Sequence, residues 1–451
     1  MTGSGMTVRS GNVSGRRWSS RLAFILAAIG SAVGLGNYWR FPYVVGEHGG
    51  GTFILAYLLS VFLVGLPLMV FEVLVGRRFR GSVRQVLSRF GHERWAVLPV
   101  VITLFVLSFY SVLVGWTLTY SVFSVLGATG NEIPYFQDYV NGYWGIVGFL
   151  TVVSITFSVV YLGVGGIERF VKPGVLIMVV ITLFLLIYAS RLPGFSEGLG
   201  FLFTPIDPSK LLNLHLWLNV LSQTTFSLSV GFGVIMTYSA YSRGSNILTD
   251  SLWIVLGDLL IAVLASMIIF SIVFTYHLTP DEGPTLMFTT LPHVFNRITF
   301  GWLIGLGFYL TLMLAGITSC ISMMEYLNNN LSGFLGLDRK KTTIIIFLLV
   351  LLLGLPVALS YTPVNLQVAG ERLLVWYDRL FVVLPVPVIL LITLSIGWLW
   401  DVDGFTRTVD RYTHLGRRWS RRLVLWIRYV IPVVVLVLLY QSITTLLGWL
   451  F

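Results

Sequence analysis

Two long apolar segments of this chain are interrupted by glycine-rich stretches, and this pattern limits what the chain can fold into. Residues 30–37 read Gly-Ser-Ala-Val-Gly-Leu-Gly-Asn, and residues 227–233 read Ser-Leu-Ser-Val-Gly-Phe-Gly. An unwound backbone inside a bilayer leaves amides and carbonyls that lipid cannot hydrogen-bond, so it persists only where it lines a cavity. Paired interruptions in two halves of a membrane protein are typical of the binding site of a secondary transporter.

The composition agrees with a membrane location. Of 451 residues, 56% are hydrophobic and only 11% are charged. A soluble core could not bury so much apolar surface, so we expect an all-α membrane protein. The apolar runs predict eleven membrane-spanning helices, at about residues 20–43, 51–76, 96–127, 143–161, 171–190, 214–241, 248–275, 299–327, 342–360, 379–400 and 423–449.

The net charge of +10 could suggest a nucleic-acid partner, but the basic residues concentrate in alternate loops. They gather at the N-terminus and in residues 77–94, 339–341 and 407–422. By the positive-inside rule these parts are cytoplasmic. The N-terminus is then cytoplasmic, and an odd number of spans leaves the C-terminus extracellular. We expect a multi-pass protein of the plasma membrane whose basic excess faces anionic lipid, without a nucleic-acid partner.

The interrupted spans are the first and the sixth, so the two enter the membrane from opposite sides. This parity predicts an inverted repeat of five plus five helices with one helix added. The expected divisions are a disordered N-terminus at 1–15, a first repeat at 16–190, an extracellular loop at 191–213, a second repeat at 214–400, a basic cytoplasmic loop at 401–422 and a last span at 423–451.

Groups around the first break could bind a zwitterion and a cation. The amides of Gly34, Leu35 and Gly36 lie at a positive half-helix end, where a carboxylate can bind. Asn37 adds a neutral oxygen suited to Na⁺. Close helix packing by small residues is the alternative. Asp258 is a lone carboxylate within the seventh span, where it could bind a cation or a proton; a protonated aspartate bonded to a neighbouring helix is the alternative.

Two hydroxyls in the eighth span form a second oxygen cluster. Thr318 and Ser319, with a carbonyl one turn earlier, would suit Na⁺, although such hydroxyls often bond back to their own helix. Cys320 is the single cysteine, so no disulfide framework exists. We interpret it as a small packing residue.

The motifs around both breaks resemble those of the neurotransmitter:sodium symporter family, including its prokaryotic amino-acid transporters. The resemblance rests on Trp-Ser-Ser-Arg-Leu at 18–22, Gly-Leu-Gly-Asn-Tyr-Trp-Arg-Phe-Pro-Tyr at 34–43 and Gly-Gly-Gly at 49–51. It continues at 223–233, 283–292 and 315–319 and covers nearly the whole chain. It implies a LeuT-type fold, with helices 1 and 6 unwound midway across the membrane.

The resemblance also implies two sodium sites. The first would use the Ala32 carbonyl, Asn37, Ser227 and Asp258, completed by the substrate carboxylate. The second would use the carbonyls of Gly30, Val33 and Ala315 with the hydroxyls of Thr318 and Ser319.

In the same way the resemblance implies a substrate pocket and an outer gate. The substrate carboxylate would meet the amides of Leu35 and Gly36 and the hydroxyl of Tyr110. The expected substrate-binding residues are Ala32, Leu35, Gly36, Val106, Tyr110, Phe226, Ser229, Phe232, Ser319 and Met323. The gate would join Arg40 and Gln223 to an acidic residue, Asp378 or alternatively Glu371.

The substrate class follows from Gly34, because biogenic-amine members carry an aspartate at this position. This chain lacks it, so the substrate should bring its own carboxylate. The expected pocket is apolar, and burying an unpaired charge is costly, which favours a neutral, hydrophobic or aromatic amino acid. Chloride-dependent relatives carry Asn at the position of Asp258 and Ser at that of Ala262. The fixed carboxylate here therefore predicts independence of chloride.

We therefore expect a sodium-coupled amino-acid symporter that works by alternating access. Gly15 replaces an arginine of the family's inner gate, with Arg16 as a candidate substitute, and the acidic partner is missing near residues 332–333. A non-transporting amino-acid sensor of the same fold is therefore the alternative. The sequence has no zinc-protease motif, cysteine pair or nucleotide-binding loop that would indicate an enzyme, and no continuous polar stripe that would indicate a channel.

Overall fold

The computed structural model describes residues 17–204, 206–242, 244, 246–278, 287–377 and 385–450. The prediction of a disordered segment at 1–15 lies outside these residues. So do Arg16 and Asp378, the residues expected at the inner and outer gates.

Each expected span overlaps a described helix or consecutive helices. Helices are favoured because a helix satisfies its own backbone hydrogen bonds in lipid. Within the described residues, eight helices are long and apolar enough to cross a membrane, and two bent helix pairs pass the same test when joined. The helices that overlap the expected spans are, in chain order, α1 (Arg21–Ala32), η2 (Gly36–Arg40), α2 (Phe41–Glu47), α3 (Gly51–Ser60), η3 (Val61–Gly65), α4 (Leu66–Phe79), η4 (Glu93–Ala96), α6 (Val97–Gly127), α8 (Trp144–Tyr161), α9 (Val164–Ala189), α11 (Leu214–Ser227), α12 (Val234–Ala240), α13 (Ile247–Thr275), α15 (Gly301–Leu335), α16 (Arg339–Leu359), α18 (Pro385–Leu399), α20 (Arg417–Leu425), η7 (Trp426–Val430) and α21 (Ile431–Leu450).

Shorter elements connect these helices. They are α5 (Val83–Ser88), α7 (Phe136–Val140), α10 (Phe195–Phe203), η5 (Lys210–Leu212), α14 (Thr290–Arg297), α19 (Val402–Thr413) and the antiparallel pair β1 (Gln367–Val368) and β2 (Glu371–Arg372).

Two segments expected to be loops are in large part helical. Residues 191–213 contain α10 and η5, and residues 401–422 contain α19 and the start of the last long helix. In α19 the Asp401 carboxylate caps the first turn, and Phe405 and Val409, four residues apart, are buried. We expected a loop at 401–422 because the segment is rich in charged residues. The spacing of its few apolar residues is nevertheless that of an amphipathic helix.

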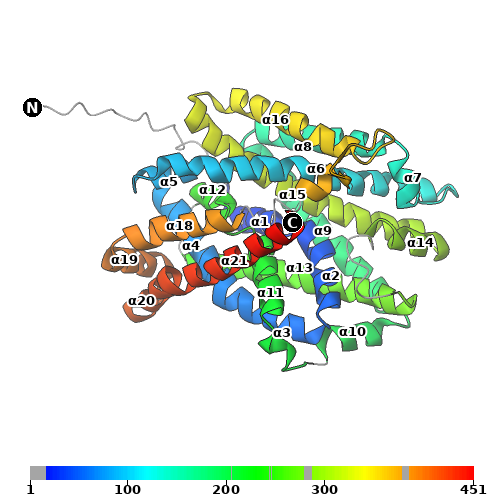
Figure 1. Cartoon of the computed structure of the whole chain (residues 1–451), viewed down its shortest axis with the longest axis horizontal. Coiled ribbons are helices and arrows are strands. Elements are labelled where there is room, and N and C mark those ends of the chain that lie inside the picture. The colour runs from blue at the N-terminus through cyan, green and yellow to red at the C-terminus, as the bar shows by residue number, and fades with distance from the viewer. Residues whose placement is uncertain are drawn as a thin grey trace, which may run out of the picture.

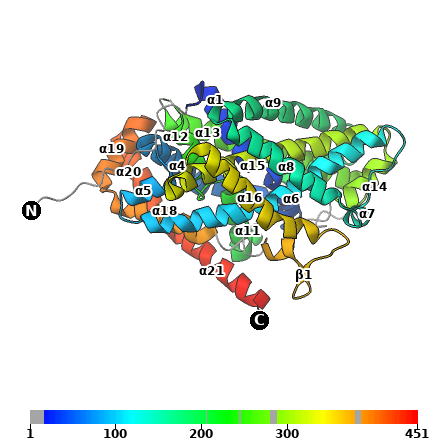
Figure 2. The ribbon, with the colours of Figure 1, turned by 90° about the horizontal axis from the view of Figure 1, so that it is seen from above.

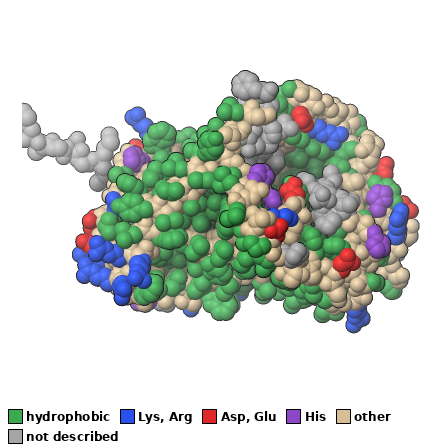
Figure 3. Space-filling view, turned by 60° about the horizontal axis from the view of Figure 1, so that its bottom comes forward, with side chains coloured by type: hydrophobic (Ala, Val, Ile, Leu, Met, Phe, Trp, Pro, Cys, Tyr) green, Lys and Arg blue, Asp and Glu red, His purple; other side chains and the backbone are tan. Residues whose placement is uncertain are grey.

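The long helices run side by side along the long axis of the molecule (Figures 1 and 2). In the centre α15 packs along α6, and α1 lies against α9, α13 and α15. Figure 3 shows a broad hydrophobic surface in the middle and a gathering of Lys and Arg side chains at the end where Figure 1 places α19 and α20. Apolar side chains exposed over such a wide area are typical of a surface that faces lipid.

Both predicted interruptions are present in the main chain. α1 ends at Ala32, Val33 has extended backbone angles, and the helix bends by 52° before it continues. Between α11 and α12 the φ angles of Ser229, Gly231 and Gly233 are all positive. Glycine adopts such angles at little cost, so the sequence permits the break where it occurs.

A carboxylate from another helix satisfies part of the second break. The amides of Gly231 and Met236 both donate to Glu72 of α4, which is fully buried. Amides that lose their helical acceptors must find others, because an unpaired buried donor is costly. Glu72 therefore stabilises the interrupted form of this helix.

Candidate functional site

A central cavity of about 60 Å³ is lined by residues from both helix breaks. All of the expected substrate-binding residues line it except Leu35, which faces a larger outer vestibule of about 550 Å³. The vestibule and the cavity share four lining residues, Gly36, Tyr110, Phe226 and Phe232. The two spaces therefore adjoin at these residues.

Gly34 and Gly36 lie at the first helix break, where neighbouring side chains leave no room for a Cβ atom. A Cβ atom at Gly34 would lie 2.8 Å from the Tyr110 hydroxyl and 3.0 Å from Ser319 Oγ, and one at Gly36 would lie 2.8 Å from the Phe226 ring. The Leu35 amide donates to the Tyr110 hydroxyl at 3.0 Å. The amide and the hydroxyl are thus bonded to each other, at the end of the cavity next to the vestibule.

The residues expected at the first sodium site lie together. Asn37 Nδ2 donates to Asp258 Oδ1 at 2.7 Å, and Ser227 Oγ donates to Asp258 Oδ2 at 2.8 Å. Asn37 Nδ2 also lies 3.2 Å from Ser227 Oγ, and all three side chains are buried. Ala32, the last residue of α1, lines the adjoining cavity.

The residues expected at the second sodium site also come together, from α1 and α15. Thr318 Oγ1 lies 2.9 Å from the Ala315 carbonyl, and Ser319 Oγ lies 3.1 Å from the same carbonyl and 3.5 Å from that of Val33. A Cβ atom at Gly30 would lie 3.4 Å from Thr318. Both hydroxyls bond back to their own helix, as the alternative interpretation expected. Their role as cation ligands stays a prediction.

Two of the three expected outer-gate residues are described and in contact. Arg40 Nη1 donates to Gln223 Oε1 at 2.6 Å, and Gln223 Nε2 donates to the Gly36 carbonyl at 3.4 Å. The Arg40 guanidinium lies 5.9 Å from the centre of the Phe226 ring, so the pair lies directly beside the cavity. Asp378 lies outside the described residues, and Glu371, the alternative partner, lies in the short strand β2.

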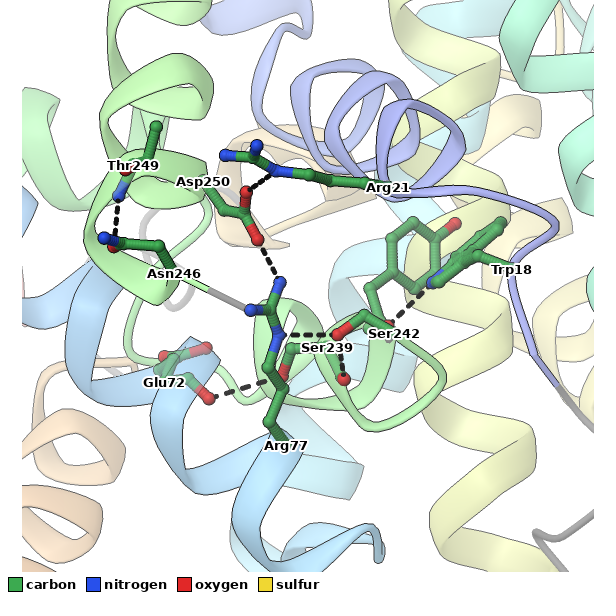
Figure 4. Close-up of polar contacts among 10 residues, drawn as sticks. Trp18, Arg21, Glu72, Arg77, Ser239, Ser242, Asn246, Thr249 and Asp250 are labelled. Carbon is green, nitrogen blue, oxygen red and sulfur yellow. Dashed lines mark hydrogen bonds and ion pairs between the residues drawn. The ribbon is translucent and has the colours of Figure 1, made fainter. Parts of the chain in front are cut away.

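The structure reveals an ionic cluster that sequence analysis missed, at the end of the bundle where α1 begins (Figure 4). The buried carboxylate of Asp250 lies between two arginines: Arg21 Nε donates to it at 2.5 Å, and Arg77 Nη2 donates to its other oxygen. Arg77 Nε also donates to Ser242 Oγ at 2.7 Å. Trp18 joins the same end of the bundle, because its indole N–H donates to the Tyr238 carbonyl at 2.8 Å.

The family resemblance implied an acidic partner of the inner gate near residues 332–333, whereas Asp250 lies in the first turn of α13. A signal for the cluster was present, because Asp250 and Arg77 are charges at the ends of apolar spans. Their pairing was not visible, since 173 positions separate them.

Comparison with known proteins identifies the family. The sequence profile of the sodium:neurotransmitter symporter family matches residues 15–132 and 136–448. The sodium-dependent transporter YhdH of Bacillus subtilis is 35% identical over 361 residues, which cover 76% of this chain and 79% of that protein. The sodium-dependent neutral amino acid transporter B(0)AT3 of Rattus norvegicus is 31% identical over 297 residues, which cover 57% of this chain and 47% of that protein.

A solved structure agrees with these matches. The crystal structure of MhsT in complex with L-phenylalanine is similar with a TM-score of 0.84 and 31% identity, over 95% of this chain and 99% of that one. The expected LeuT-type fold is thereby confirmed. The chain is a multi-pass membrane protein, and its family and fold are those of sodium-dependent transporters rather than of enzymes. On this evidence the chain belongs to the sodium:neurotransmitter symporter family.

Proposed function

We propose that this protein couples the entry of Na⁺ to the import of a neutral amino acid, hydrophobic or aromatic, by alternating access. The main support is Asp258. Both of its oxygens accept hydrogen bonds, as those of an ionised carboxylate do, and none of the described ion pairs includes it. A buried, unpaired carboxylate is costly. A bound Na⁺ would supply the missing charge.

The substrate class follows from the walls of the central cavity. Its described lining residues are apolar, hydroxyl-bearing or glycine, and none is charged. A substrate with an ionised side chain would leave that charge unpaired, which disfavours it. The hydroxyl of Tyr110, whose oxygen accepts from the Leu35 amide, can donate a hydrogen bond to a carboxylate. MhsT, crystallised with L-phenylalanine, and B(0)AT3, named for neutral amino acids, support the same class.

We propose two sodium ions, one at each oxygen cluster described above. A membrane potential of 100 mV contributes about 2.3 kcal/mol per entering charge, so two ions would contribute about 4.6 kcal/mol. A tenfold concentration gradient costs about 1.4 kcal/mol. The potential alone would therefore sustain about a thousandfold accumulation of a zwitterionic substrate.

Independence of chloride is part of the proposal. The Asp258 carboxylate supplies a fixed negative charge beside the first cation. Ala262, one turn further along α13, is buried and has no hydroxyl to offer an anion. A bound chloride is therefore not needed to balance the charge of the cations.

Alternating access would place the cavity between two closures. Arg40 and Gln223, with Asp378, would form the outer one, and the Asp250 cluster lies at the opposite, inner end. The sensor alternative rested on the missing inner acid, and Asp250 offers one. We propose the inverted-repeat division at residues 16–190 and 214–400, with the N-terminus in the cytoplasm and the C-terminus outside.

Uptake into proteoliposomes tests the proposal. An inward sodium gradient should drive accumulation of a labelled neutral amino acid, and replacement of chloride by gluconate should leave the rate unchanged. Binding without accumulation would favour the sensor. A several-fold fall in gluconate would contradict chloride independence, and equal uptake in potassium would contradict coupling to sodium.

A further inference from the structure

The central cavity has two chemically different ends. At one end it shares Gly36, Tyr110 and Phe226 with the vestibule. The other end, here called the floor, is lined by Ser31, Thr103 and Ser322, none of which lines the vestibule. The expected substrate-binding set did not include any of these three residues.

Their positions along the helices place them away from the vestibule. Thr103 precedes Tyr110 by two turns of α6, about 10 Å along the helix axis. Ser322 follows Ser319 by one turn in α15. The start of α6 and the end of α15 lie at the same end of the bundle, because Arg84, in the short helix α5 that precedes η4 and α6, donates to the Gly333 carbonyl. Ser31 donates to Ser322 Oγ at 2.8 Å and so belongs to the same end.

The hydroxyl protons at the floor are already used. Ser322 Oγ donates to the Ser319 carbonyl at 2.8 Å, so in the bond between the two serines Ser31 must be the donor. Thr103 Oγ1 donates to the Pro99 carbonyl at 2.7 Å. No described group donates to Ser31 Oγ or to Thr103 Oγ1. The floor thus presents hydrogen-bond acceptors without donors.

We infer that the floor is a subsite for a hydrogen-bond donor on the ring of the substrate, which makes an aromatic amino acid with a ring O–H or N–H, tyrosine or tryptophan, the preferred class. This inference rests on the proposed function, because it assumes that the carboxylate binds beside Leu35 and Tyr110. The side chain then extends toward the floor. A phenol that meets an acceptor there recovers the hydrogen bond it lost in water, whereas a ring without a donor leaves the acceptors unpaired.

The test compares tyrosine with 4-fluorophenylalanine, a ring of similar size without a donor, in calorimetric binding to the purified protein in NaCl. Tyrosine should bind about tenfold more tightly, as expected for one well-made buried hydrogen bond. In the triple variant Ser31→Ala/Thr103→Val/Ser322→Ala this preference should disappear, while 4-fluorophenylalanine should bind at least as well as before; Ser322 is included because the loss of Ser31 alone would free its oxygen as an acceptor. The wild-type ratio is informative even if the variant does not fold.

Thr117→Val is the matched control. Thr117 lies in the same helix, is buried and bonds back to the Val114 carbonyl at 2.8 Å, but it lines neither cavity. Its removal should leave the ratio of the two affinities unchanged. Equal affinities in the wild type, or a preference that survives the triple variant, would overturn the subsite and leave the proposed function intact. Absence of sodium-dependent binding for every neutral amino acid would overturn both.

Discussion

Replacement of Asp258 by Asn removes one charge from the proposed first sodium site and leaves its shape almost unchanged. In the structure Asp258 accepts from Asn37 at 2.7 Å and from Ser227 at 2.8 Å. An asparagine can keep the first bond through its carbonyl oxygen and form the second by donating to the serine oxygen. The expected effect is therefore electrostatic rather than a loss of packing.

Its size follows from the interaction between Na⁺ and the carboxylate. Two unit charges about 4 Å apart interact with about 4 kcal/mol at an effective dielectric constant of about 20. Each 1.4 kcal/mol is a factor of ten, so the affinity for sodium should fall by about a thousandfold in Asp258→Asn. Chloride should not restore the lost affinity, because Ala262, one turn further along α13, has no hydroxyl to offer an anion.

The assay measures the initial rate of uptake into proteoliposomes as a function of external sodium, in gluconate and in chloride. Ser266→Ala is a suitable control, because Ser266 lies two turns along α13, is buried and bonds only to the Ala262 carbonyl in the described structure. A half-saturating sodium concentration in gluconate that is the same for Asp258→Asn and the wild type would refute the assignment.

Three further substitutions test the site and the inner cluster. The Leu35 amide donates to the Tyr110 hydroxyl at 3.0 Å. Tyr110→Phe removes this hydroxyl and should raise KM about tenfold in uptake assays. Gly34→Ala places a methyl group 2.8 Å from that hydroxyl, so binding measured by calorimetry should be lost in a protein that still folds. Asp250→Asn weakens two ion pairs in a buried cluster, and should lower the thermal unfolding temperature in detergent more than Arg21→Gln does, because the Arg21 side chain is 43% exposed. Unchanged KM, retained binding or equal unfolding temperatures would contradict the respective expectations.

The fold could be predicted because its strongest determinants are local. Runs of apolar residues mark the spans, and the glycines at 34, 231 and 233 mark positions where a side chain would clash or where φ is positive. The helix α19 was missed because its buried face consists of few apolar residues among charges. There the amphipathic period, rather than the charge, was the informative signal.

The site could be predicted only in part. Asn37 and Asp258 could be singled out from the sequence because a polar side chain within an apolar span is itself unusual. The floor residues Ser31 and Ser322 could not be singled out in this way, since serine in an apolar helix usually bonds to its own backbone. The pairing of Asp250 with its arginines depends on helix packing, which spacing along the chain does not encode.

The carboxylate of Glu72 has a consequence for how this protein can change over evolutionary time. It substitutes for the acceptors that the sixth span lacks around Gly231 and Met236, so an interruption in one helix depends on a side chain in another. Without the Glu72 carboxylate, the amides of Gly231 and Met236 would lose their acceptor. With a continuous sixth helix, those amides would bond within the helix, and the buried carboxylate would lose its donors. Positions 72 and 231 should therefore be inherited together, and in descendants whose sixth span is continuous the acidic residue should have vanished as well.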